Sequence, residues 1–201
     1  MTRTICVTHV KDDIPVEGVV IIYCGAPGQG KSTIAKAVEE RGTRNKLHIR
    51  TFSADNAFIS EDGTYEFVPW GTGPAHAHLQ HQFTTAIQGT EFDIIQVDNT
   101  NLRPWEMLHY KREARLYHWA VIVCDLRNGP LYGSIHGVAK KQALTMLSNA
   151  DSPLPTPHLR EVHDSLTELY NDVVTVTSGA LLFDLLPFYV EGFKDEKNYD
   201  Y

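Results

Sequence analysis

The sequence predicts a three-layer α/β fold, in which helices flank a mostly parallel β-sheet. Short apolar runs without polar alternation, typical of strands buried on both faces, alternate along the chain with segments of helical periodicity. The first of these runs, Val19–Cys24, passes directly into a glycine-rich turn and then into a helical segment. Strands that alternate with helices are joined by crossover connections, so a parallel sheet sandwiched between helices is expected.

The N-terminal half contains the first strands and helices of this pattern. A glycine is expected to cap the first helix at Gly42 and the second at Gly89, because glycine favours the position after a helix. A further strand is predicted before the glycine-rich turn, where polar and apolar residues alternate loosely. The expected elements are strands at residues 2–10, 19–24, 47–53 and 92–98 and helices at residues 31–40 and 75–89.

The C-terminal half continues the alternation. Pro104 occupies the favoured first position of a helix that extends to about Leu116. Residues 151–157 form a proline-rich connection, and the charged residues 191–201 are expected to form a mobile tail. The other expected elements are strands at residues 117–126 and 173–178 and helices at residues 138–148 and 157–170.

The composition indicates one domain in a reducing compartment. At 201 residues, of which 42% are hydrophobic, the chain suffices for one well-buried α/β domain, so residues 1–201 are treated as a single unit. Cys6, Cys24 and Cys124 lie in apolar runs and cannot all pair, so we expect core thiols. No signal-peptide pattern or apolar run of about 20 residues is present, which predicts a cytoplasmic protein without a membrane partner. The net charge of −7 argues against a broad electrostatic contact with nucleic acid, although a local basic channel is compatible with it.

Residues 25–33 form a phosphate-binding motif. The spacing Gly25-x-x-x-x-Gly30-Lys31-Ser32 is that of a P-loop, in which backbone N–H groups surround phosphates, the lysine reaches the β- and γ-phosphates and the serine binds Mg²⁺. The alternative is a glycine-rich turn that binds nothing, but strand, loop, lysine, hydroxyl and helix occur in the required order. We therefore expect a P-loop NTPase-type fold with ATP (or GTP) and Mg²⁺. The predicted nucleotide-binding residues are Gly25, Ala26, Pro27, Gly28, Gln29, Gly30, Lys31, Ser32 and Thr33.

Two aspartates follow the next strands of the predicted sheet. Ligands of such sheets bind beyond the carboxyl ends of the strands, so Asp55 and Asp98 are expected to face the P-loop across one crevice. Asp55 can position or deprotonate the hydroxyl that attacks a γ-phosphate, or it can cap a short helix. Asp98 can hold Mg²⁺ through water, with Asn99, Thr100 and Asn101 bonding the loop or the acceptor, or these residues can build an Asx turn.

Two further groups of residues have both a functional and a structural interpretation. The spacing of His76, His78 and His81 does not supply the i, i+4 pair of a helical zinc site, so a metal site is not expected there. A second segment combines basic and aromatic residues, which suits a nucleic acid strand stacked beside a charged helix, but a solvated helix face over core aromatics is favoured. Its members are Trp105, Tyr110, Lys111, Arg112, Arg115 and Tyr117.

The chain resembles the polynucleotide-kinase-like P-loop phosphotransferases, and among them the kinase-like module of Nedd4-binding protein 2 relatives. The resemblance covers about residues 18–147 and is carried by the ordered segments GAPGQGKST, SADNAF, GTYEF, AHAHLQHQF, VDNTN, WEMLHYKREA and HGVAKKQALTML. It implies a kinase in which Asp55 is the general base for a nucleic acid 5′-hydroxyl and Lys31 acts on the phosphates. It also implies that Ser32 and Asp98 hold Mg²⁺.

The chain departs from this family at two places. Phe58 stands where the phage polynucleotide kinase has an arginine, and Gly133 and Ser134 precede the HGV segment where family lids carry arginine and asparagine. The lid arginine neutralises charge on the phosphates in the transition state, and Arg127, Lys140 and Lys141 are candidate replacements. The possible lid or acceptor contacts are Asn99, Asn101, Arg127, His136 and Lys140.

These observations lead to one expected function and several alternatives. The expected function is an ATP- and Mg²⁺-dependent kinase that phosphorylates a nucleic acid 5′-hydroxyl. Within the same class, the acceptor can instead be a hydroxymethylated base in DNA or a small molecule. A nucleotide-binding module that recruits partners with little catalysis is the alternative from another class, favoured by the missing lid arginine. The sequence leaves the oligomeric state open.

Overall fold

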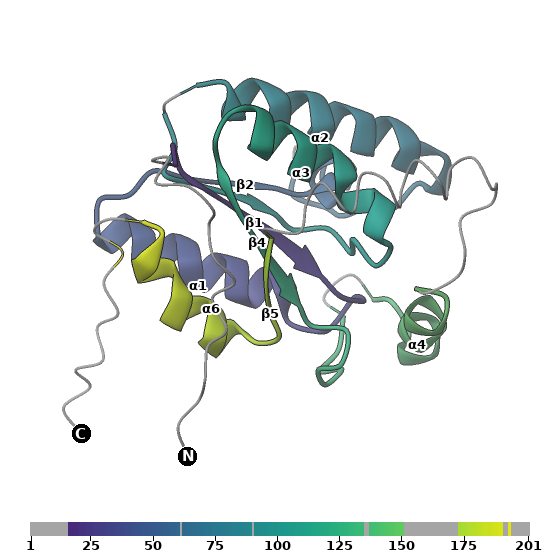
Figure 1. Ribbon diagram of the computed structural model, residues 1–201. Coiled ribbons are helices and arrows are strands. Elements are labelled where there is room, and N and C mark those ends of the chain that lie inside the picture. Colours follow the sequence, from purple (N-terminus) through teal and green to yellow (C-terminus); the bar gives the residue numbers. More distant parts are fainter. Residues whose placement is uncertain are drawn as a thin grey trace, which may run out of the picture.

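The computed structural model describes residues 16–60, 62–89, 91–134, 137–150, 173–190 and 193. In this part of the chain, five parallel strands form one sheet in the order β2-β3-β1-β4-β5. Helices cover both faces of the sheet (Figure 1), so the expected three-layer α/β fold is confirmed. The strands are β1 (Val19–Cys24), β2 (Ile49–Phe52), β3 (Ile94–Val97), β4 (Ala120–Asp125) and β5 (Val174–Val176), and the helices are α1 (Lys31–Arg44), α2 (Thr72–Ile87), α3 (Leu108–Leu116), α4 (Lys140–Ser148) and α6 (Gly179–Leu185).

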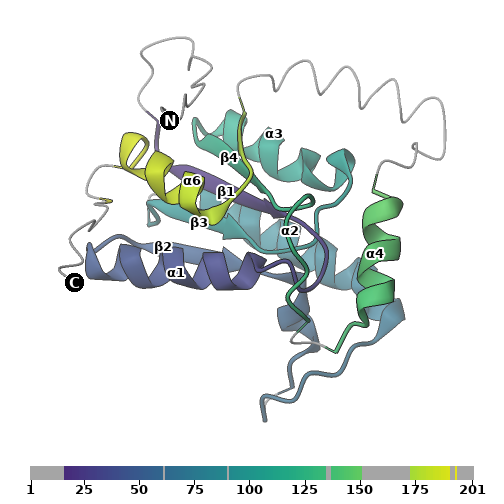
Figure 2. The same ribbon diagram turned by 90° about the horizontal axis from the view of Figure 1, so that it is seen from below.

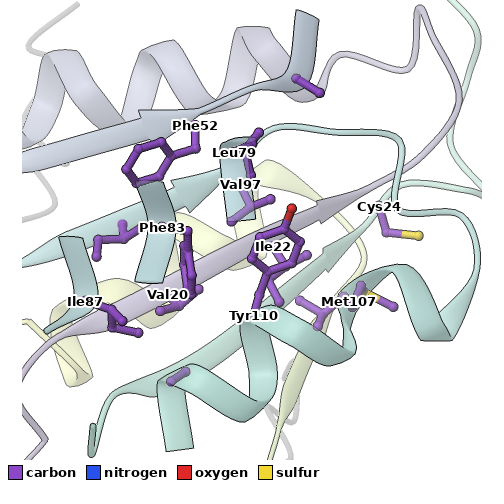
Figure 3. Packing of buried hydrophobic residues seen from close by; sticks show 14 of the residues in the cluster. Val20, Ile22, Cys24, Phe52, Leu79, Phe83, Ile87, Val97, Met107 and Tyr110 are labelled. Atoms are coloured by element: carbon purple, nitrogen blue, oxygen red, sulfur yellow. The ribbon is translucent and has the colours of Figure 1, made fainter. Parts of the chain in front are cut away.

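The central strand β1 separates two hydrophobic clusters. Its side chains alternate between the faces of the sheet, and all six residues are buried, as expected for a strand covered on both sides. Val20, Ile22 and Cys24 face the cluster under α2 and α3 (Figure 3). Ile21 and Tyr23 belong to the other cluster, which α1 and α6 cover (Figure 2). The fold therefore fixes the end of β1, from which the P-loop emerges, from both sides.

A buried hydrogen-bond network connects α1 with the sheet. The hydroxyl of Tyr23 donates to Oε1 of Gln96 at 2.5 Å, and Nε2 of Gln96 donates to the carbonyl of Ala35 at 3.2 Å and to Oγ1 of Thr51 at 2.8 Å. Gln96 is fully buried, so these bonds satisfy polar groups that water cannot reach. They hold the helix that begins at the P-loop lysine against β1, β2 and β3.

Several predicted boundaries differ from the structure. Helix α1 continues to Arg44 and ends at the cap Asn45, so the expected cap at Gly42 is wrong. Gly42 lies inside the helix, where it leaves room for the side chain of Ile49 on β2, with which a Cβ would collide. Helix α2 begins at Thr72 rather than at residue 75, and the segment from Pro104 starts as a 3₁₀ helix before α3.

The C-terminal part contains an element that the sequence pattern did not predict. Helix α6 is short and mostly apolar, and the hydroxyl of Ser178 caps it by accepting from the N–H of Leu181 at 3.2 Å. Phe193 is 1% exposed and belongs to the core, which corrects the expected mobile tail at that residue. The other residues of 191–201, the strand at 2–10, the connection at 151–157 and the helix at 157–170 lie outside the described residues.

Two further expectations concern the thiols and the membrane. Cys24 and Cys124 are buried free cysteines, as predicted, whereas Cys6 lies outside the described residues. Within the ranges that the structure describes, no helix combines the length and the apolar character needed to span a bilayer.

Candidate active site

A cavity of about 510 Å³ lies beyond the carboxyl ends of β1, β2 and β3. It brings together the P-loop, the segments after β2 and β3, the start of α2 and the segment before α4. Its size suits a nucleotide-sized ligand. The lining residues are Pro27, Gly28, Gly30, Lys31, Ser32, Thr33, Ala54, Asp55, Phe58, Tyr65, Phe67, Thr72, His76, Asp98, Asn99, Thr100, Gly133, Ser134, Gly137, Val138, Gln142 and Met146.

The P-loop has the backbone conformation that only glycine adopts readily. Gly28 and Gly30 have φ angles of 86° and 85°. At Gly28 the fit is also tight, because a Cβ there would lie 2.8 Å from the carbonyl carbon of Gly133. The N–H of Tyr132 donates to the carbonyl of Gly28 at 2.9 Å, so residues 132–134 pack directly on the loop. Together these contacts leave a narrow cradle at the start of α1, suited to a phosphate.

Lys31 combines burial with a polar environment. It is 8% exposed, and its Nζ donates to the carbonyl of Ala26 at 3.0 Å. Burial lowers the pKa of Lys31 below its usual value, while the carboxylates of Asp98 and Asp55 act in the opposite direction. The ammonium group therefore lines the same cavity as two carboxylates, and it is the positive charge there that can attract a bound phosphate.

Gln29 holds the P-loop against the segment that follows β4. Its Oε1 accepts from the N–H of Ala26 at 2.6 Å, and its Nε2 donates to the carbonyls of Leu126, Arg127 and Gly129 at 2.8, 3.2 and 3.1 Å. The side chain is 3% exposed. Within the predicted nucleotide-binding set, Gln29 therefore stabilises the loop and does not line the cavity. Gly25 and Ala26 are also buried, and neither lines the cavity.

Asp55 is presented to the cavity by a 3₁₀ helix, Ala54–Phe58, that follows β2. Ser53 caps this helix, because its side chain accepts from the N–H of Asp55 at 3.3 Å. The capping interpretation of Asp55 is therefore not needed. The hydroxyl of Tyr65 donates to Oδ1 of Asp55 at 3.3 Å, and burial together with the charge and hydrogen bond of Asp55 raises the pKa of Tyr65. Tyr65 thus remains a hydrogen-bond donor at neutral pH.

The segment after β3 contributes both cavity residues and structural bonds. Asp98 and Asn99 line the cavity beside the P-loop strand, as predicted. Oδ1 of Asn99 accepts from the N–H of Ala54 at 2.8 Å, which links this segment to the 3₁₀ helix that carries Asp55. The carbonyl of Thr100 accepts from the N–H of Gly25 at 2.9 Å and ties the same segment to the P-loop.

Three of the predicted lid or acceptor residues, all in the described part of the chain, do not line the cavity. Asn101 is buried and its Nδ2 donates to the carbonyl of Tyr23 at 2.9 Å, so it supports the end of β1. Arg127 forms an ion pair with Asp125, with its terminal nitrogen 2.7 Å from Oδ2. Lys140 is exposed at the start of α4 and does not line the cavity. His136 lies outside the described residues.

One apolar part of the cavity lining was not recognised from the sequence. Phe58, Tyr65 and Phe67 line the cavity, and the ring centroids of Phe58 and Phe67 are 5.3 Å apart. The only signal was that Phe58 follows Asp55 and that GTYEF recurs in the resembled family. His76 also lines the cavity, but in the described ranges no three His, Cys, Asp or Glu side chains form a metal cluster.

None of the six residues of the basic and aromatic segment lines this cavity. Tyr110 is a core residue at 1% exposure, and its ring makes an edge contact with Phe83 at 5.0 Å between centroids. Arg112 pairs with the buried Glu113 at 2.7 Å. Neither residue lines the cavity, which agrees with the favoured interpretation of a helix face above core aromatics.

Comparisons with known proteins agree with this fold. No family profile matches the chain. NEDD4-binding protein 2 from Homo sapiens is 28% identical over 138 residues, which are 65% of this chain and 8% of that protein, so the chain spans only a small part of this relative. Among solved structures, Chaetomium thermophilum Kti12 in complex with ADP-AlF₃ has a TM-score of 0.54 at 12% identity, covering 85% of this chain and 98% of Kti12. A fungal RNA kinase gives a TM-score of 0.44 at 12% identity and covers 92% of each chain. The likeness to Kti12 shows that this chain has the P-loop NTPase fold that its strand, loop and helix predict.

Proposed function

We propose that the protein is an ATP- and Mg²⁺-dependent kinase that transfers the γ-phosphate to a hydroxyl on nucleic acid, most directly a polynucleotide 5′-hydroxyl. The observation that carries the proposal is the cavity in which Lys31 and Ser32 of the P-loop meet Asp55 and Asp98. A P-loop alone serves motors, switches and kinases alike. A carboxylate held across the cavity from the phosphate cradle is the additional feature that phosphoryl transfer to an alcohol requires.

The proposed roles follow from position and charge. Lys31 and the backbone N–H groups around Gly28 and Gly30 neutralise the β- and γ-phosphates. The oxygen of the acceptor hydroxyl bonds to the γ-phosphorus, and the bond from that phosphorus to the leaving ADP oxygen breaks. Asp55 accepts the proton of the acceptor hydroxyl during this step. The proton thus ends on Asp55, and ADP carries the charge of the leaving oxygen.

The donor set near the P-loop fits Mg²⁺. Ser32 is an exposed hydroxyl in the first turn of α1, and Asp98 supplies a carboxylate on the same side of the cavity. Mg²⁺ prefers oxygen ligands and keeps several waters, so one hydroxyl and one nearby carboxylate are sufficient protein ligands. When bound, Mg²⁺ neutralises charge on the phosphates.

The acceptor class rests on the family resemblance. The segments around Asp55 and Asp98 match those of polynucleotide-kinase-like enzymes, in which the corresponding aspartate deprotonates a 5′-hydroxyl. A hydroxymethylated base or a small alcohol would use the same chemistry, so the acceptor is decided by the part of the cavity beyond Asp55.

A binding module with little catalysis is the second candidate, and one observation favours it. Lys31 is the single lysine or arginine among the described residues that line the cavity, and Arg127, which does not line it, is paired with Asp125. Transition-state charge on the transferred phosphoryl group is usually met by more than one cation. Asp55 argues against this candidate, since nucleotide binding alone needs no base.

Transfer assays with γ-labelled ATP separate the two candidates. The acceptors are 5′-hydroxyl DNA, 5′-hydroxyl RNA, hydroxymethyluracil DNA and nucleosides, tested with the parent and with Asp55→Asn. We expect Asp55→Asn to lower turnover by about 10²–10⁴-fold, the usual contribution of a general base, while ATP affinity is kept. Equal turnover of parent and variant, or no transfer to any acceptor, would replace the kinase proposal with the binding module.

A further inference from the structure

We infer that the rings of Phe58, Tyr65 and Phe67, here called the aromatic wall, form the acceptor subsite and stack against the terminal nucleobase of the acceptor strand. This inference rests on the proposed function and deepens it. It assigns the acceptor to molecules that carry a flat heterocycle next to the reacting hydroxyl.

The aromatic wall lies on the Asp55 side of the cavity. Tyr65 connects the two directly, because its hydroxyl donates to Oδ1 of Asp55 at 3.3 Å. Its ring contacts Phe58 edge-on, with centroids 6.4 Å apart and an interplanar angle of 75°. The P-loop lines a different part of the same cavity, so a molecule whose hydroxyl reaches Asp55 has its remaining atoms beside these rings.

The three rings differ in burial, which separates support from contact. Phe58 is 8% exposed and belongs to the hydrophobic cluster under α2, so it anchors the wall. Phe67 packs on Phe58 at 5.3 Å and 57° yet is 54% exposed. Such a ring is held in place by a buried neighbour while much of its surface stays available to a ligand. An exposed apolar surface lining a cavity commonly marks a binding site.

The other residues on this side favour a nucleobase over an aliphatic or purely polar occupant. Thr72 and His76, from the first turns of α2, line the cavity together with the aromatic wall. A nucleobase has a flat face that can stack on Phe67 and polar edges that can form hydrogen bonds with such side chains. An aliphatic chain can form no hydrogen bonds with them. Stacking also tolerates all bases, because every base has a π-face.

The test uses two 5′-hydroxyl oligonucleotides that differ only in the terminal nucleotide. One carries a base there, and the other carries an abasic residue with the same 5′-hydroxyl. The proteins are the full-length parent, Phe67→Ala, Phe67→Tyr, which retains a ring, and the control Phe188→Ala, which removes a 78% exposed ring outside the cavity. Acceptor KM, ATP KM and thermal midpoint are measured for each.

We expect the parent to have a KM about 5- to 100-fold lower for the base-bearing strand, the range that one base–aromatic stack supplies. Phe67→Ala should lose this preference with ATP KM unchanged, while Phe67→Tyr and Phe188→Ala retain it. The preference should be similar for all four bases. If Phe67→Ala unfolds, Phe67→Leu replaces it. We then expect Phe67→Leu to lose the preference for the base-bearing strand and Phe67→Tyr to retain it.

Two outcomes overturn the inference, and both differ from the outcome that would refute the kinase proposal. Transfer to both strands with equal KM, or a preference that Phe67→Ala leaves intact, removes the subsite while the kinase stands. If no protein transfers phosphate to either strand, the kinase proposal fails, and equilibrium binding of the two labelled strands decides the subsite. Equal affinities, or a difference that Phe67→Ala does not change, then exclude stacking on the aromatic wall.

Discussion

Asp55 shows how individual contacts bear on two interpretations that the residue type leaves open. The sequence allowed Asp55 to be a base or a helix cap, and the structure gives the cap to Ser53. Its carboxylate faces the cavity and accepts a hydrogen bond from Tyr65. Such a bond fixes the orientation of a carboxylate that must meet the acceptor hydroxyl, so Tyr65 is a positioning residue in the proposed mechanism.

Tyr65→Phe tests this bond while preserving the aromatic ring. We expect turnover to fall by about tenfold, within the range of a lost hydrogen bond to a charged group, with acceptor and ATP KM nearly unchanged. Because the pKa of Tyr65 is raised, the hydroxyl stays protonated and the effect should be constant from neutral pH to at least pH 9.

The measurement is kcat and KM as functions of pH for the parent and Tyr65→Phe, with Tyr132→Phe as the control at an exposed tyrosine. A purely structural role for Tyr65 would lower the thermal midpoint and change acceptor and ATP KM together with kcat. That result would exclude the positioning role without affecting the assignment of Asp55.

At the scale of elements, Gln29 joins the P-loop to the segment after β4. Its four hydrogen bonds involve three carbonyls and one N–H from two separate parts of the chain. Gln29→Ala leaves these buried groups without their partner, and we expect the free energy of unfolding to fall by about 2 kcal/mol. Nucleotide affinity should fall as well, because the cradle loses its support.

Chemical denaturation and nucleotide titration of Gln29→Ala check this expectation. Gln82→Ala provides the matched control, since Gln82 is exposed on α2. If both variants are as stable as the parent and bind nucleotide equally, the bonds of Gln29 do not contribute to the cradle.

The sequence was informative about which elements exist and less so about where they end. Strands such as β1 are predictable because a run of apolar, mostly β-branched residues has few other stable environments. The predicted helix cap at Gly42 was wrong because this glycine allows close packing against Ile49, a residue of the next element, β2. Helix α6 has only seven residues and an apolar sequence, so it offered no periodic pattern to recognise.

At the scale of the molecule, half of the candidate site follows from topology. In a parallel sheet the carboxyl ends of neighbouring strands share one edge, so the segments carrying Lys31, Asp55 and Asp98 had to meet. The aromatic wall could not be found in the same way, because Tyr65 and Phe67 lie outside the main sheet, in a segment held by an antiparallel bridge between Tyr65 and Ile59 and by packing against Phe58. The pairing of Arg127 with Asp125 was not predictable either, because a sequence does not show which carboxylate an arginine contacts.

The whole molecule should also report nucleotide binding through its stability. A ligand that binds only the folded chain raises the free energy of unfolding by about 2.7 kcal/mol at a hundredfold excess over Kd. For a chain of 201 residues, this corresponds to a rise in thermal midpoint of about 5–10 °C.

Lys31→Ala should abolish most of this rise because it removes the buried cation of the cradle, whereas Lys36→Ala, at a lysine whose side chain is 75% exposed, should keep it. The measurement is thermal unfolding with and without ATP and Mg²⁺, and with adenosine to separate phosphate recognition from base recognition. Equal shifts for the parent and Lys31→Ala would mean that the nucleotide binds elsewhere on the folded chain.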